Sequence, residues 1–316
     1  MKRHLSPTYV FMKKLGFILP LAALTLLASC NSETAGSSSA VSITYSSYSG
    51  EKKGEISVCA SELPHAKILN ECIAPLVAED GYSLKVKVLD WTIQNDAVAN
   101  GEYDANYFEH VPYLKTYTGT TALYAACKVH YEKLCVYANN TSKKTLWNGA
   151  KIELVNDVSN VERALQLLAS NNILTINANN YNANKEFANF DVTHPNDGVT
   201  FADAYKNCTL TCLKESQLCQ SLPDYDFGII PGNTAMTGLG SDYATRISFG
   251  EAPSDELISQ KANIITVTKA NKDSAKTKEL VKACSDPRLG QYISGTFGES
   301  VLYHFENGLT TDFLAA

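Results

Sequence analysis

An arginine near the start of a predicted helix is the first residue of this sequence whose position suggests chemistry. Residues 159–162, Ser-Asn-Val-Glu, have the pattern of a capping box, which predicts a helix that begins at Asn160. Arg163 then lies about one turn inside the helix end that carries roughly half a positive charge, where a cation is mildly unfavourable. One interpretation is a solvated surface arginine. The other is that Arg163 and the helix end together hold an anion.

Two α/β units would position such a site. In chain order, the first unit is predicted to contain strand 56–60, helix 65–79, strand 83–89, helix 92–100, strand 103–108 and a helix that includes Tyr113. Strand–helix alternation predicts an α/β lobe with a largely parallel sheet. Ligands of such sheets gather at the carboxyl ends of strands and the amino ends of helices.

A similar pattern returns later in the chain. Strand 151–155 leads into the helix that contains Arg163, and strand 225–230 begins with Tyr-Asp, as strand 103–108 does. Two related halves predict a two-lobed clamp with a seam between the lobes. The strand 263–269 and the two helices after it are expected to return to the first lobe. We therefore predict lobe 1 from residues 54–135 plus 240–316 and lobe 2 from residues 136–239.

The first 53 residues are predicted to lie outside the folded lobes. Residues 1–30 combine Lys13 and Lys14, an apolar run of about 11 residues and Leu-Ala-Ser-Cys, which is the pattern of an export signal ending at a lipobox. Cys30 is the predicted lipidation site; an ordinary signal peptide with an incidental cysteine is the alternative. A complete signal begins at Met12, so residues 1–11 are consistent with a misassigned start. The Ser-rich residues 31–53 indicate a flexible tether.

The charge balance argues against nucleic-acid binding. The whole chain has a net charge of −6, and residues 1–30 contain four basic residues and no acidic ones. The chain beyond Cys30 therefore has 23 basic against 33 acidic residues, a net charge of −10. A chain with this balance and no basic stripe is a poor nucleic-acid binder.

Eight cysteines follow Cys30, at positions 59, 72, 127, 135, 208, 212, 219 and 284. Their even number in an exported chain permits disulfides, but the sequence cannot choose among the possible pairings. Free buried thiols are the alternative. The spacing of Cys208, Cys212 and Cys219 does not match a zinc site, and we predict no metal site and no cofactor.

Several of these segments together resemble the NlpA/MetQ family, the lipid-anchored substrate-binding components of methionine ABC importers. The most specific segment is GEYDANYFEHVPYL, residues 101–114, and the similarity covers most of residues 56–304. Further matching residues are Pro64-His65-Ala66, Asp90-Trp91, Lys128-Val129-His130, Asn156-Asp157 and Arg163-Ala164-Leu165. The resemblance implies a two-lobed periplasmic-binding-protein type II fold that closes on its ligand in a cleft.

The resemblance also implies roles for individual residues. Arg163 would bind the α-carboxylate of an amino acid, and Asn160, on the same helical face, would hydrogen-bond its polar end. Three first-lobe residues, Phe108, His110 and Tyr113, would complete the site, together with Trp91 at a position where the family usually has tyrosine. An aromatic wall suits a thioether, which gains about 0.3–1.5 kcal/mol per ring. Core packing is the alternative for Phe108 and Trp91, and a structural role is the alternative for His110.

One departure from the family pattern affects the expected ligand. Residues 230–235 read Ile-Pro-Gly-Asn-Thr-Ala, so Pro231 stands where the family carries an amide just after the isoleucine. Asn233 could replace that amide from two residues away, or the ligand could make one polar contact fewer. Methionine, another apolar amino acid and a methionine-containing dipeptide all remain open as ligands.

We predict a monomeric, lipid-anchored solute-binding protein on the extracytoplasmic face of the cell membrane. It would deliver L-methionine or a similar amino acid to an ABC permease with its ATPase subunits. An enzyme is disfavoured, since the sequence contains no GxSxG, HExxH, Walker or dinucleotide-binding motif. An adhesin or structural lipoprotein without a small ligand is the rival from another class.

Overall fold

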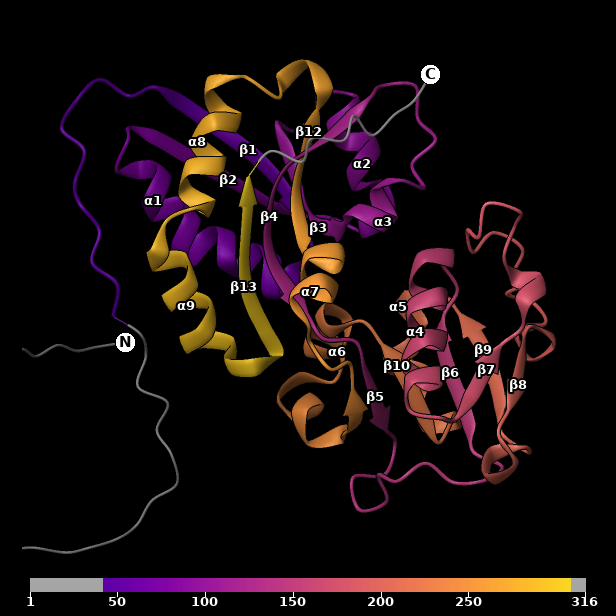
Figure 1. Ribbon diagram of the computed structural model, residues 1–316. Helices are drawn as coiled ribbons and strands as arrows, with labels where there is room; N and C mark the ends of the chain where they lie inside the picture. The colour runs from indigo at the N-terminus through magenta and orange to yellow at the C-terminus, as the bar shows by residue number, and fades with distance from the viewer. Residues whose placement is uncertain (1–41, 308–316) are drawn as a thin grey trace, which may run out of the picture. The chain divides into compact units, whose positions relative to one another are not determined.

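The computed structural model describes residues 42–307, and two β-sheets organise this part of the chain (Figure 1). The predicted signal peptide, the lipidation site at Cys30 and residues 31–41 of the tether lie outside the described residues. The first sheet has the strand order β13-β4-β12-β3-β1-β2, and the second has the order β11-β5-β10-β6-β9. Two short strands, β7 and β8, form a separate pair.

The strands are β1 (Gly54–Ala60), β2 (Tyr82–Val88), β3 (Ala105–His110), β4 (Leu123–Glu132), β5 (Cys135–Ala138), β6 (Lys151–Val155), β7 (Leu174–Ile176), β8 (Val199–Phe201), β9 (Thr209–Leu213), β10 (Phe227–Ile230), β11 (Ile247–Gly250), β12 (Asn263–Thr268) and β13 (Val301–Asn307). The helices are α1 (Ala74–Ala78), α2 (Trp91–Ala99), α3 (Val111–Leu114), α4 (Val158–Ser170), α5 (Glu215–Ser221), α6 (Gly232–Gly238), α7 (Asp255–Lys261), α8 (Ala275–Cys284) and α9 (Pro287–Phe297). The predicted helix 65–79 corresponds to the helical segments Glu62–Ala66 and Leu69–Ile73 followed by α1.

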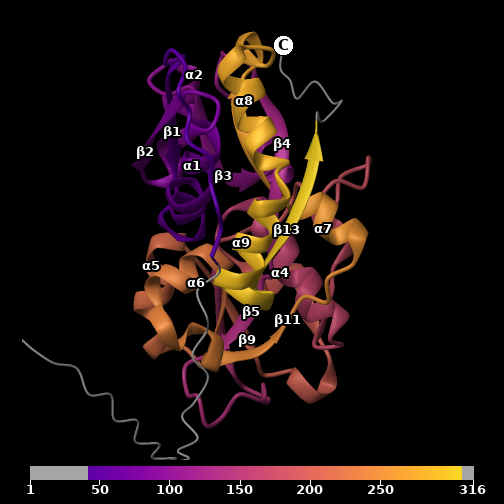
Figure 2. The same ribbon diagram turned by 90° about the vertical axis from the view of Figure 1, so that its left-hand side faces the viewer.

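Alternate residues of β1 face two different apolar clusters, as the period of a strand requires. Ile56 and Val58 join the cluster that includes residues of α1, α8 and α9, whereas Cys59 packs with Ala97 and Val98 of α2. The first sheet is therefore covered by helices on both faces. Figures 1 and 2 show α8 and α9 together on one of these faces, with α9 alongside β13.

The second sheet is sandwiched in the same way. Ile152 and Leu154 of β6 pack against Val161 and Leu165 of α4, while the next residue, Val155, lies in the cluster that includes Leu218 of α5. The predicted α/β class with two lobes is confirmed by this pair of three-layered units.

The expectation of largely parallel sheets is wrong for the first lobe. Only β1–β2 and β1–β3 pair in parallel there, while β12 is antiparallel to both of its neighbours and β13 is antiparallel to β4. The reason is that the C-terminal strands come back from the second lobe and insert beside β3 and β4 in the opposite direction. Local strand–helix alternation carries no information on such late insertions.

The chain crosses between the sheets twice. It leaves the first sheet at residues 133–134, between β4 and β5, and returns through residues 251–262, between β11 and β12. The predicted lobe boundaries remain predictions. Because β11 belongs to the second sheet, we propose that lobe 2 extends to about residue 250 rather than ending at residue 239.

The start of α4 differs from the prediction. The helix begins at Val158, and its N-cap is Asp157, whose carboxylate accepts a hydrogen bond from the backbone N–H of Asn160 at 3.0 Å. Aspartate is as good an N-cap as serine, and the helix uses Asp157 rather than Ser159, two residues later. Arg163 consequently lies deeper in the helix than the capping-box pattern indicated.

Two further features bear on the predicted export of the chain. All eight cysteines after Cys30 are free thiols, and six of them are buried. Of the two alternatives left open by the sequence, the structure therefore supports free thiols.

Among residues 42–307, no helix combines the length and the apolar character needed to cross a bilayer.

Candidate ligand-binding site

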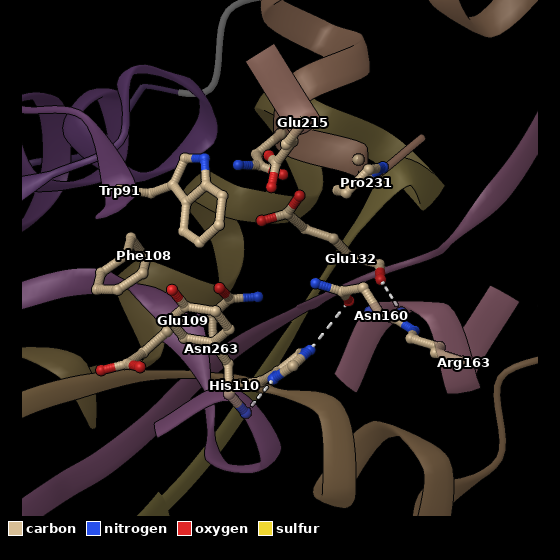
Figure 3. Close-up of a pocket in the computed structure, with 13 residues that line it drawn as sticks. Trp91, Phe108, Glu109, His110, Glu132, Asn160, Arg163, Glu215, Pro231 and Asn263 are labelled. Atoms are coloured by element: carbon tan, nitrogen blue, oxygen red, sulfur yellow. Dashed lines mark hydrogen bonds between the residues drawn. The ribbon is translucent and has the colours of Figure 1, made fainter. Parts of the chain in front are cut away.

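A cavity of about 500 Å³ lies between the two lobes. This space is partly open to solvent. Its lining, drawn in Figure 3, consists of Trp91, Phe108, Glu109, His110, Tyr113, Glu132, Asn160, Arg163, Glu215, Pro231, Gly232, Asn233 and Asn263. The structure thus brings together all seven side chains that the sequence analysis selected for ligand binding, from five different elements.

Three aromatic rings of the first lobe form one wall of the cavity. Trp91 is the first residue of α2, where Asp90 caps the helix, and Phe108 and Tyr113 come from β3 and α3. The ring centroids of Trp91 and Tyr113 are 5.3 Å apart, those of Phe108 and Tyr113 are 5.8 Å apart, and both pairs meet edge to face. This geometry is favourable for aromatic pairs, so the rings hold one another in place as a rigid apolar surface.

His110 connects this wall to the second lobe. Its Nδ1 atom accepts the backbone N–H of Tyr113 at 3.1 Å, so the neutral ring carries its proton on Nε2. Nε2 then donates to Oδ1 of Asn160, 3.3 Å away across the cleft (Figure 3). Burial, helped by the positive charges of Arg163 and Lys261, lowers the pKa of His110 to about 3. The ring is therefore an uncharged hydrogen-bond donor at neutral pH.

Asn160 is held from both sides. While its Oδ1 atom accepts from His110, its Nδ2 atom donates to the carboxylate of Asp157 at 3.0 Å. The second Nδ2 hydrogen and the remaining lone pair of Oδ1 are what Asn160 can offer to a ligand.

Arg163 is buried at the cavity edge, and it has a protein partner that the sequence did not reveal. Nε and Nη2 donate to the two carboxylate oxygens of Glu251 at 2.7 and 2.6 Å, and Nη2 also donates to the backbone carbonyl of Glu132 at 2.7 Å. Glu251 in turn accepts the hydroxyl of Tyr131 and the backbone N–H of Leu134. The guanidinium therefore ties α4 to both crossing segments, which leaves Nη1 as the group that a ligand in the cavity would meet.

The charge states of this pair follow from their environment. Burial alone would lower the pKa of Arg163, but the ion pair with Glu251 outweighs burial and raises it. Burial raises the pKa of Glu251, and the charge and hydrogen bonds of Arg163 more than offset this, so the net direction is downward. Both groups are ionised at neutral pH, and the guanidinium charge is balanced within the protein.

Three buried glutamates also line the cavity, and none of them was selected from the sequence. Glu109, Glu132 and Glu215 are 3%, 5% and 8% exposed. Burial raises the pKa of Glu109 to about 8, that of Glu215 to about 7, and that of Glu132 as well. Within residues 42–307, no lysine or arginine lies within ion-pair distance of these three carboxyl groups.

Glu132 belongs to a hydrogen-bonded chain beneath the cavity. Tyr107 hydroxyl donates to Nδ1 of His130, whose Nε2 donates to Oε1 of Glu132 at 2.8 Å. His65 approaches the same oxygen at 3.5 Å and contacts Asn263 at 3.0 Å. Burial lowers the pKa of His65 to about 4 and that of His130 to about 3, so both rings are neutral.

The same residues are the best candidates for a metal in the described part of the chain. The donor atoms of His65, His130 and Glu132 lie within 4.8 Å of one another. A zinc ion would require each donor at about 2.0–2.2 Å and would have to replace the existing His130–Glu132 hydrogen bond. We interpret the group as a hydrogen-bonded network, and the absence of a metal remains a prediction.

The missed residues had weak sequence signals for physical reasons. Glu132 ends a strand whose other residues are largely apolar, and an acid in such a run was a usable sign of a buried site. Glu215 opens α5, where an acidic residue is ordinarily explained by the helix dipole. Glu251 is 88 positions away from Arg163, and no local pattern connects them.

Comparison with known proteins gives a consistent result. A family model described as NlpA lipoprotein matches residues 56–305. The methionine-binding lipoprotein MetQ of Bacillus subtilis is 32% identical over 259 residues, which are 79% of this chain and 88% of that protein.

Solved structures with the same arrangement include a Bacillus subtilis lipoprotein. The TM-score is 0.67 at 29% identity, with 80% of this chain and 98% of that one covered. A nutrient binding protein from Burkholderia cenocepacia bound to methionine gives a TM-score of 0.68 at 24% identity, covering 78% of this chain and 99% of that one. The latter likeness concerns the fold.

Proposed function

We propose, because this chain belongs to the NlpA lipoprotein family, that it is a solute-binding protein that captures an amino acid, with methionine as the first candidate. The observation that carries the proposal is the cavity between the lobes, where an aromatic wall faces Arg163 and Asn160. A thioether side chain suits the rings, and the α-carboxylate would approach the free side of the guanidinium. The Bacillus subtilis relative, named as methionine-binding, supports this ligand.

Capture would couple to closure of the lobes. A ligand that contacts both walls binds the closed arrangement more tightly than an open one, so it shifts the population toward the closed form. The two crossing segments, 133–134 and 251–262, would act as the hinge. The closed form would then dock on an ABC permease whose ATPase subunits power uptake.

The lipid anchor at Cys30 would keep the protein at the extracytoplasmic face of the membrane. A tether raises the effective concentration of the binding protein near its permease. We infer that it acts as a monomer and performs no catalysis; at the level of the family, the relatives are binding proteins.

A methionine-containing dipeptide is the second candidate, and one observation favours it. A neighbouring cavity of about 920 Å³ shares Trp91, Glu215 and Asn233 with the first one. A ligand that is longer than one amino acid could extend into it.

Native mass spectrometry of protein purified without added ligand tests the proposal, together with calorimetry against the twenty amino acids and methionine dipeptides. We expect a retained or titratable amino acid, with methionine among the tightest. Protein that carries no small molecule and gives no heat with any member of the panel would overturn the proposed function. An adhesin or structural lipoprotein predicts that outcome.

A further inference from the structure

Two carboxyl groups converge in the cavity from opposite lobes. Glu132 is the last residue of β4, and Glu215 is the first residue of α5. Figure 3 shows their carboxyl groups pointing toward each other in the space beside the indole of Trp91. Both side chains are more than nine-tenths buried, at 5% and 8% exposure.

We propose that Glu132 and Glu215 form a cation-binding subsite that holds a primary ammonium group of the ligand. This inference rests on the proposed function, because it names the group of the captured molecule that these residues recognise. It also adds a requirement: the ligand must carry an ammonium group, whatever its side chain.

The charge balance of the cavity supports this assignment. Arg163 is the cation of the lining, and its charge is already matched by Glu251. The carboxyl groups of Glu132 and Glu215 have no lysine or arginine partner in the described part of the chain. A buried carboxylate without a partner is costly, so such groups either take up a proton or await a cation.

The two carboxyl groups keep acceptor capacity for a ligand, although the backbone N–H of Asn233 also hydrogen-bonds the carboxylate of Glu132. Oε1 of Glu132 accepts from His130, and Oε1 of Glu215 accepts the hydroxyl of Thr234. The second oxygen of Glu132 faces α6, where a Cβ atom at Gly232 would lie only 2.8 Å from it. The glycine therefore lets the carboxylate approach the second lobe closely, and an ammonium group with three hydrogens could bridge the remaining lone pairs of the two carboxyl groups.

The surrounding groups favour an ammonium over a metal ion. Calcium takes six to eight oxygen ligands, whereas this part of the cavity supplies two carboxyl groups beside an aromatic ring. A small organic cation gains from such a ring as well as from the carboxylates. Pro231 offers the ligand neither a side-chain hydrogen bond nor an N–H, so Glu215 and Asn233 are the polar groups of that wall.

Burial adds a measurable consequence. It raises the pKa of Glu215 to about 7, and the negative charges of Asp157, Glu132 and Asp90 act in the same direction. A bound ammonium would stabilise the ionised form, so binding near neutral pH should release part of a proton.

Three probes with the same side chain separate the charged groups of the ligand. L-methionine carries both charges, L-methioninamide keeps only the ammonium, and N-acetyl-L-methionine keeps only the carboxylate. Calorimetry with wild-type protein is expected to detect the first two and not the third. Binding of N-acetyl-L-methionine as tightly as L-methionine would overturn the subsite.

The variant Glu215→Gln keeps the size of the side chain and removes its charge. Its affinity for L-methionine should fall by about thirtyfold, the equivalent of losing one charge-assisted contact. Calorimetry in buffers of different ionisation enthalpy should show proton release for wild-type protein and a smaller release for the variant, in which Glu132 is the remaining carboxyl group of the subsite. Unchanged affinity and unchanged proton release would overturn the subsite while leaving the proposed function intact.

Glu153→Gln is the matched control. Glu153 is also fully buried, burial raises its pKa to about 7, and it hydrogen-bonds Ser221 away from the cavity. This change should leave affinity and proton release as in wild type, and thermal unfolding of all three proteins checks that they fold.

The remaining outcomes separate the two proposals. If no amino acid or dipeptide binds wild-type protein but L-methioninamide does, and Glu215→Gln weakens it, the subsite stands and the amino-acid function falls. If neither the amino acids nor L-methioninamide bind, both proposals fall.

Discussion

The two walls of the cleft are built from the same kinds of elements, but they offer a ligand different chemistry. The first lobe presents the rings of Trp91, Phe108 and Tyr113, which contact one another edge to face. The second lobe presents polar and charged groups, including Arg163 and Glu215. An apolar side chain would therefore lie against the rings, and a charged head group would lie toward Arg163 and the carboxyl groups of Glu132 and Glu215, so the ligand would be fixed in one orientation.

The comparison extends to how the two lobes handle buried charge. Arg163 is matched permanently by Glu251, and both remain ionised. Glu109 in the first lobe has only neutral partners, since it accepts hydrogen bonds from Asn95 at 3.1 Å and Thr266 at 3.0 Å. The first arrangement resists changes of pH, and the second responds to them.

Arg163→Ala should have the largest effect on the difference between the two lobes. Loss of a charge-assisted contact should weaken amino-acid binding by roughly 2–5 kcal/mol. The variant should also lose about 3–5 kcal/mol of stability, because Glu251 would remain buried without its partner. Calorimetry measures the first effect and urea unfolding the second.

Two further variants separate these roles of Arg163. Adding Glu251→Gln to Arg163→Ala should recover much of the stability but not the affinity. Arg288→Ala is the matched control, since this half-buried arginine pairs with Glu79 and Asp286 outside the cavity and should leave affinity unchanged. Normal binding by Arg163→Ala would refute its role as carboxylate ligand.

Glu109→Gln tests the pH-responsive side of the comparison. Burial raises the pKa of Glu109 from its usual 4.5 to about 8. The contribution of the protonated side chain to the stability of the fold is therefore complete below about pH 4.5, and it is lost as the pH rises toward 8. The glutamine variant lacks this loss. Its stability relative to wild type should therefore increase by roughly 2–4 kcal/mol between pH 4.5 and 8.

Urea unfolding at several pH values measures this difference. The same substitution at the exposed Glu102 provides the control for the chemical change alone. If the difference in unfolding free energy between wild type and Glu109→Gln does not change over this pH range, Glu109 ionises in the folded protein without a loss of stability.

Sequence patterns predicted the positions of the site residues better than their partners. The strands that became β1, β2, β6 and β12, and the helix that became α2, could be predicted because apolar alternation and helix-end residues are local. The seven predicted side chains meet because they lie at strand ends and helix starts, which an α/β lobe gathers at one edge.

What the sequence did not reveal depends on distant contacts. The pairing of Arg163 with Glu251 and the approach of Glu132 to Glu215 join segments that are far apart in the chain. The prediction for the N-cap of α4 was wrong for a different reason: Asp157 and Ser159 both fit local capping rules, so the local pattern alone does not choose between them.

Trp91→Ala should have a smaller effect than Arg163→Ala and Glu109→Gln. It tests the contribution of the aromatic wall alone. Loss of one ring should cost about 0.3–1.5 kcal/mol of methionine affinity through its contact with sulfur. Norleucine has a similar shape without the sulfur, so the preference for methionine over norleucine should shrink in the variant. Trp147→Ala is the control, because Trp147 packs against Phe227 in the second lobe at 5.0 Å and should alter stability only. If Trp91→Ala lowers the affinity for methionine and for norleucine equally, the indole shapes the cavity without recognising the thioether. The two walls would then differ only in that one is apolar and the other is charged.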